Sequence, residues 1–150
     1  MKGINAYLSV EEADEIISLR LREMDELRIF WEVLDENEKE AYLIRSTEQL
    51  DRLLIRGKKA DMSQLLMFPR EGMGEVPDVV LTACAFNALG IMNDEIKEAA
   101  QKQVNIMSAL GMIMPQKTAA ASDVLQPKKL ASKTAMHLMK PYLRGGFQIV

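Results

Sequence analysis

The run from Val79 to Leu89 constrains the fold of this 150-residue chain more than any other feature. It reads VVLTACAFNAL and is apolar on nearly every side of a helix. A helix with that pattern is buried on most of its surface, whereas a surface helix shows a single apolar stripe. Pro77 lies just before the run, and its fixed φ suits the first turn of a helix. We therefore expect a central helix over about 77–92, with other helices packed around it.

Gly90 and the pair Asn93-Asp94 predict a bend or interruption at the end of this central helix. Apolar residues then return at helical spacing from Ile96 to Leu110, and Gly111 marks the end of that pattern. Only 5% of the residues are aromatic and eleven are methionine, which is typical of helical cores filled by aliphatic and thioether side chains. The composition and spacing together indicate an all-α protein.

The amino-terminal third begins with a helix signal. Ser9 and Glu12 have the spacing of a capping box, in which each side chain accepts a backbone N–H of the first turn. Apolar residues then recur at three- and four-residue steps from Ala13 to Leu34, with a break expected near 24–26. This pattern predicts a first helical segment that is interrupted once.

A second capping box predicts the next helix. Asp35 and Glu38 repeat the spacing, and an apolar face continues until Gly57, a residue suited to a left-handed helix end. We expect this helix to cover about 36–56. The short connection to the preceding helix favours an antiparallel hairpin and hence a small antiparallel bundle.

The remaining segments are expected to be irregular. Residues 58–76 contain prolines and glycines but also apolar residues, so they predict an ordered loop that covers the core. Residues 111–130 lack a helical period and predict an extended arm, followed by a short amphipathic helix over about 131–143. The organisation that we predict is a helical core over 1–110 and a C-terminal arm over 111–150.

Charge is divided unevenly along the chain, although the net charge is only −3. Residues 1–100 carry 12 Lys and Arg against 21 Asp and Glu, whereas residues 101–150 carry 7 against 1. A basic tail on an acidic body can meet nucleic acid, an acidic partner or the acidic part of another copy, and it can also simply be solvated.

The sequence contains few residues that could bind a metal or catalyse a reaction. One cysteine, Cys84, and one histidine, His137, do not make a zinc site, and Cys84 is expected to be buried as a small apolar residue. The acidic clusters coincide with helix starts, where carboxylates interact favourably with the positive end of the helix dipole, so they are expected to stabilise helices rather than to bind a metal. No nucleophile elbow or phosphate-binding glycine loop occurs. We expect no enzyme activity, cofactor or metal, and no secretion signal or membrane span.

Single-stranded DNA binding needs cationic groups beside aromatic rings, because phosphate neutralisation and base stacking supply the affinity. Most aromatic residues of this chain lie in its acidic part, and the basic part contains only Tyr142 and Phe147. The residues alone therefore give this function little support.

Several short blocks, taken in their order along the chain, resemble one known family. The blocks are Asn5–Asp14, Trp31, Leu50-Asp51-Arg52, Gly57-Lys58-Lys59, Gln64–Gly72, Val76-Pro77-Asp78 and Pro141–Gly146. They resemble the head-tail connector (adaptor, head-completion) proteins of tailed bacteriophages, a family that includes members described as DnaT-like single-stranded DNA-binding proteins. The resemblance covers residues 5–91 and returns at 141–146.

The resemblance implies an all-helical subunit of a homo-oligomeric ring, usually of twelve copies, beneath the phage portal. Such a ring joins the DNA-filled head to the tail or neck proteins, and double-stranded DNA passes through its channel without specific binding. The location would be the virion, and the host cytoplasm during assembly. The alternative that the same resemblance leaves open is a DnaT-like single-stranded DNA-binding replication protein.

The resemblance also assigns residues. The signature positions, interpreted mainly as structural, are Trp31, Gln64, Leu65, Pro69, Arg70, Val76 and Pro77. Connector C-termini reach toward the portal, so the apolar and basic residues near the end, which have no evident core of their own, are predicted to bind the portal or a neighbouring subunit. These are Lys128, Lys129, Leu130, Lys133, Met136, Leu138, Met139, Lys140, Tyr142, Leu143, Arg144 and Phe147.

Overall fold

The computed structural model describes residues 1–111 and 130–145. Its helices are α1 (Val10–Arg20), α2 (Glu26–Glu32), α3 (Glu36–Asp51), α4 (Asp78–Ala109) and α5 (Lys133–Met139), and the 3₁₀ turn η2 (Lys140–Tyr142) follows α5. The described residues form no strand, only isolated bridges. The all-α prediction is confirmed.

Both predicted capping boxes are present. Ser9 begins α1 and exchanges hydrogen bonds with Glu12, and Asp35 begins α3 in the same way with Glu38. The expected break in the first segment is also confirmed, because α1 ends at Arg20 and α2 begins only at Glu26.

The end of α3 differs from the prediction. The helix stops at Asp51 rather than near residue 56, because Leu53 and Ile55 leave the helical path and become buried in the core. Gly57 does have a left-handed backbone, with φ of 81°, but it turns an extended segment instead of capping a helix.

α4 is the central helix, and it contacts α1, α2, α3 and α5. Every buried residue of α4 lies between Val80 and Met92, in agreement with the apolar run. The predicted interruption is wrong, because the helix runs through Gly90 and on to Ala109 without a break. Gly90 serves close packing instead, since a Cβ built there would lie 2.9 Å from the backbone of Ala131.

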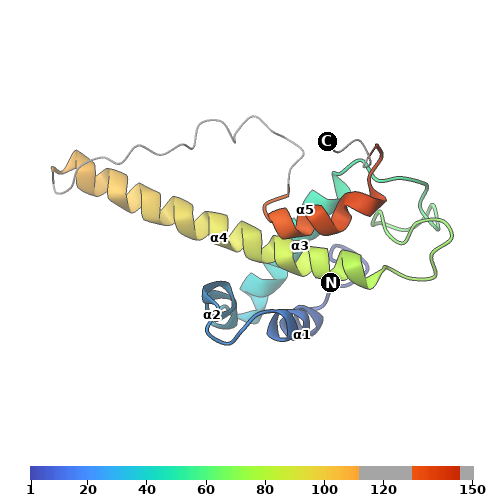
Figure 1. Cartoon of the computed structure of the whole chain (residues 1–150), viewed down its shortest axis with the longest axis horizontal. Helices are drawn as coiled ribbons and strands as arrows, with labels where there is room; N and C mark the ends of the chain where they lie inside the picture. Colours follow the sequence, from blue (N-terminus) through green and yellow to red (C-terminus); the bar gives the residue numbers. More distant parts are fainter. Residues whose placement is uncertain (112–129, 146–150) are drawn as a thin grey trace.

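The second part of α4 extends beyond the rest of the fold. A helix of this length spans about 48 Å. Figure 1 shows that its second half projects beyond the other helices. Glu95 still pairs with Arg45 of α3, and Ile96 still packs against the core, so the projecting part of α4 begins after them, at residue 97. In the described part of the chain, α4 is also the one helix long and apolar enough to cross a membrane, but 56% of the apolar window is buried in the fold, as in a core helix.

The C-terminal segment folds back onto α4. Leu130, Ala135 and Met139 are buried in the same core as α1, α3 and α4, and Figure 1 shows α5 lying along α4. The expectation that this segment has no core within the chain is therefore wrong for residues 130–145. Most of the expected extended arm, residues 112–129, lies outside the described residues.

The loop between α3 and α4 covers the core as predicted. Phe68 is buried, and its backbone N–H donates to the hydroxyl of Tyr7 at 3.2 Å. The same hydroxyl donates to Asp51, whose other carboxylate oxygen accepts the backbone N–H of Met67 at 3.3 Å. These bonds join the N-terminal segment, the end of α3 and the loop.

Candidate nucleic-acid interface

Two segments far apart in the sequence pair at one end of the molecule. The N–H of Arg56 donates to the carbonyl oxygen of Tyr142 at 2.7 Å, and the N–H of Arg144 donates to that of Leu54 at 2.8 Å. Ile55 and Leu143 stand opposite each other in this short antiparallel bridge. Ile55 is buried and Leu143 packs against the core, so the alternation of side chains turns residues 54, 56 and 144 toward solvent.

The pairing brings basic residues from both segments together. We define the basic ridge as Arg56, Lys58, Lys140 and Arg144, with the aromatic ring of Tyr142 among them. Arg56, Lys58 and Arg144 are exposed, and Lys140 is half-buried. Neither residues 52–60 nor residues 130–145 contain an acidic residue.

The ridge stands on a rigid support. The buried guanidinium of Arg70 donates to the carbonyl oxygen of Arg56 at 3.0 Å and to that of Met67 at 3.0 Å, and it also donates to Gly57. These bonds fix the turn that carries Arg56 and Lys58. The ring of Tyr142 meets the buried ring of Phe68 edge-on, with centroids 5.5 Å apart, which fixes the other segment.

Three of the four cationic side chains of the ridge take part in no ion pair within the described residues. They are Lys58, Lys140 and Arg144, while the side chain of Arg56 donates to the carbonyl oxygen of Pro141. The acidic residue Glu71 adjoins this edge, because its N–H donates to the carbonyl oxygen of Lys58 at 2.8 Å. Unpaired lysine and arginine side chains on an exposed edge are suited to phosphate groups.

Asp51, beneath the ridge, belongs to the support rather than to the exposed charge. Burial raises the pKa of its carboxyl group above the ordinary value, although hydrogen bonds from Tyr7 and Met67 oppose that rise. Burial also raises the pKa of the Tyr7 hydroxyl, and the neighbouring Asp51 adds to that effect. This pair stabilises the junction of the N-terminus, α3 and the loop.

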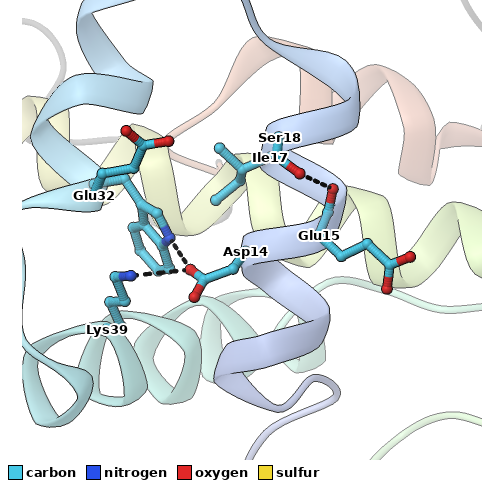
Figure 2. Close-up of a pocket in the computed structure, with 7 residues that line it drawn as sticks. Asp14, Glu15, Ile17, Ser18, Glu32 and Lys39 are labelled. Atoms are coloured by element: carbon cyan, nitrogen blue, oxygen red, sulfur yellow. Dashed lines mark hydrogen bonds and ion pairs between the residues drawn. The ribbon is translucent and has the colours of Figure 1, made fainter. Parts of the chain in front are cut away.

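A hollow lies on the acidic side of the molecule, between α1, α2 and α3 (Figure 2). It has a volume of about 420 Å³ and is bordered by Asp14, Glu15 and Glu32. Asp14 accepts hydrogen bonds from Nε1 of Trp31 at 2.7 Å and from Nζ of Lys39 at 3.1 Å. Carboxylates dominate its rim, so it does not suit a phosphate backbone.

No group of three or more His, Cys, Asp or Glu side chains in the described part of the chain is arranged to hold a metal ion. Cys84 is buried, as expected, and burial raises the pKa of its thiol, so it is poorly suited to nucleophilic chemistry. The chemistry available at the surface is therefore that of charge and of one aromatic ring.

Comparison with known proteins agrees with a nucleic-acid interface. Residues 1–150, the whole chain, match the family described as "Putative DnaT-like ssDNA binding protein". The chain belongs to this family. Among curated proteins and solved structures, no match to the chain was found.

Membership of the DnaT-like family changes the balance between the two functions that the sequence left open. The description of the family favours the alternative interpretation, single-stranded DNA binding, and no comparison indicates a head-tail connector. A twelve-fold ring, a portal partner and a tail or neck partner stay predictions that rest on the resemblance alone.

The residues predicted to bind a partner divide into three groups. Leu130 and Met139 are buried, and Met136, Leu138, Tyr142 and Leu143 pack against the core, so they serve this chain's own fold. Lys133, Lys140 and Arg144 stay accessible. Lys128, Lys129 and Phe147 lie outside the described residues.

The signature residues gather around the loop and the amino-terminal helices. Trp31 is buried, Arg70 is buried under the ridge, and Pro77 directly precedes α4. Gln64, Pro69 and Val76 line a hollow of about 160 Å³ beside Tyr7 and Phe68. Leu65 is the exception, because 67% of it is exposed.

Sequence reasoning missed the contribution of Arg56 and Lys58 to the basic ridge of this DnaT-like protein. The first hundred residues are acidic on average, and that average concealed a local run, residues 52–59, with four basic residues and no acidic one. A charge profile over short windows would have found the run. The pairing of this run with residues 142–144 could not be predicted from a single sequence.

Proposed function

We propose that this protein binds single-stranded DNA through the basic ridge. The observation that carries the proposal is the bridge between residues 54–56 and 142–144, which joins two acid-free basic segments into one exposed surface. The description of the family supports the same function. The proposed activity is binding and requires no catalytic group.

The ridge has both components of a surface for single strands. Arg56, Lys58, Lys140 and Arg144 place cationic groups along one edge, where they neutralise successive phosphates and release counterions. Tyr142 is half-exposed beside them, and an aromatic ring at such an edge offers a face for base stacking. Neither component depends on the identity of the base, so the expected binding is indifferent to sequence.

The acidic remainder of the molecule directs the strand to the ridge. Fourteen of the 22 acidic residues lie before residue 52, eleven of them on α1, α2 and α3, and they repel a phosphate backbone. The ridge is thus the surface on which DNA binding costs least electrostatically. The field of the molecule restricts the strand to one end of the fold.

The test is a titration of the protein into a fluorescently labelled oligo-dT, followed by anisotropy at several salt concentrations. The Arg144→Gln variant should bind more weakly, and the slope of log K against log salt should fall by about 0.7, because one phosphate contact is lost. Arg22→Gln is the matched control, since Arg22 is exposed near the end of α1, away from the ridge. That variant should keep the affinity and the slope.

Tyr142→Leu tests stacking separately from charge. It should weaken binding while leaving the salt slope unchanged, because no cationic group is removed. Circular dichroism must first show that each variant keeps the helix content of the wild type. Equal weakening by the Arg22 and Arg144 substitutions, or no measurable binding by the wild type at low salt, would refute the proposal.

A further inference from the structure

The exposed side of α5 carries a row of basic side chains that leads into the basic ridge. Lys133 and His137 are exposed, and Lys140, the last of the row, is half-buried and already belongs to the ridge. Lys140 caps α5 with a helical backbone. Successive residues of an α-helix are rotated by about 100°, so the three side chains fall within an arc of about 60°. We call these three residues the α5 row.

The fold fixes this row on the outside of the helix. Ala135 and Met139 are fully buried in the core, and the helical period places His137 opposite them. The side chain of Ser132 accepts the N–H of Ala135 at 3.2 Å, and the N–H of Ser132 donates to Oδ1 of Asn87 on α4 at 3.1 Å. These contacts hold α5 in one orientation on α4, so the row keeps its place relative to the ridge.

The support of the row carries no negative charge. Residues 130–145 contain no acidic residue, and the buried part of α4, residues 80–92, contains no charged residue. The flanking acidic residues of α4, Asp78 and Asp94, lie beyond the two ends of that part. Lys133 and His137 form no ion pair within residues 1–111 and 130–145. A phosphate backbone that leaves the ridge along α5 therefore meets cationic side chains on an uncharged support.

We propose that a single strand bound on the ridge continues along the exposed side of α5, where Lys133 and His137 contact its further phosphates. The ammonium group of Lys133 attracts a phosphate as a point charge, and the imidazole of His137 donates an N–H. This inference rests on the proposed function and adds the class of substrate, which is a strand long enough to cover both surfaces. From Lys133 to Lys140 the helix rises by about 10 Å, which is the length of about three stacked nucleotides.

The length of the oligonucleotide separates the two parts of this surface. An oligo-dT of about 5 nucleotides fits on the ridge, which has most of the cations and the ring of Tyr142, whereas one of about 15 nucleotides also reaches α5. Lys133→Gln should weaken binding of the longer strand several-fold and lower its salt slope by about 0.7, with no change for the shorter strand. Arg144→Gln should weaken binding of both strands.

Lys102→Gln is the matched control, because Lys102 is exposed on the projecting part of α4 and the change in charge is the same. It should leave the binding of both strands unchanged. His137→Gln provides a second measurement, and it should weaken binding of the longer strand alone. Circular dichroism must first show that each variant keeps the helix content of the wild type.

The outcomes distinguish this inference from the proposed function. If Lys133→Gln and His137→Gln bind both strands as tightly as the wild type, while Arg144→Gln weakens both, the strand does not cross α5 and this inference alone is overturned. Equal losses from the Lys133 and Lys102 substitutions would also overturn it, because they would reflect the overall charge. If the wild type binds neither strand at low salt, the proposed function fails and this inference fails with it.

Discussion

Substituting Gly90 by alanine tests whether the C-terminal segment packs against α4 as described. In an exposed helix this change would stabilise the protein by about 1 kcal/mol, because alanine is the better helix former. Here the added Cβ would lie 2.9 Å from the carbonyl carbon of Ala131 and 2.9 Å from the nitrogen of Ser132. Both are backbone atoms, and the same nitrogen donates to Oδ1 of Asn87 at 3.1 Å. The contact is therefore relieved only by moving the segment.

The expected effect follows from these two opposing terms. Forcing an extra carbon into a packed contact costs about 1–3 kcal/mol, and the gain in helix propensity offsets about 1 kcal/mol of that. Gly90→Ala should thus fail to raise the free energy of unfolding and should lower it by up to about 2 kcal/mol. Residues 130–145 should also exchange their amide hydrogens faster, because the shift loosens Leu130 and Met139 in the core.

Urea denaturation followed by circular dichroism measures the change, and hydrogen exchange locates it. Gly74→Ala is the control, because a Cβ at Gly74 meets nothing within 4 Å and its φ is not positive. This control should leave stability unchanged or raise it slightly. If Gly90→Ala instead raised stability by about 1 kcal/mol, as in an exposed helix, the packing of residues 130–145 on α4 would be refuted.

Three further substitutions test the support of the fold. Asp51→Asn should gain stability relative to the wild type as the pH rises from about 4 to about 7, because burial raises the folded-state pKa of Asp51 and its ionisation then disfavours the folded state. Urea unfolding at each pH measures the difference in stability between the variant and the wild type. A difference that does not change with pH would contradict the prediction. Trp31→Phe should cost about 2 kcal/mol, since Asp14 loses the indole donor; thermal unfolding followed by circular dichroism checks this. Arg70→Met should cost about 3 kcal/mol, because the carbonyl oxygens of Arg56 and Met67 lose a charged donor, and the same melt would detect it.

Local signals along the sequence predicted local structure. The two capping boxes placed the starts of α1 and α3, and the apolar run placed the buried half of α4, because each depends on residues within a turn or two of one another. Gly90 and Gly57 misled the prediction for the same reason. Each was assigned a local role, as a helix interruption or a helix cap, whereas its actual place depends on residues 131 and 142–144, far along the chain.

The candidate site shows the same contrast between local structure, which the sequence predicts, and contacts across the chain, which it does not. The basic character of residues 140–144 was evident in the sequence. The apolar residues beside them were predicted to bind a partner, because no core within the chain was evident for them. Leu130 and Met139 find that core on α4. The ridge depends on a pairing across the chain, and a single sequence contains no signal for such a pairing.

The bridge at residue 55 has a consequence for how the protein is made. Arg56 and Pro141, which meet there, are 85 positions apart in the chain. During translation the first half of the basic ridge leaves the ribosome long before the second, and neither half alone has the full set of cations. If the ridge binds DNA as we propose, a prematurely terminated product lacks half of its cations and should bind more weakly than the full polypeptide.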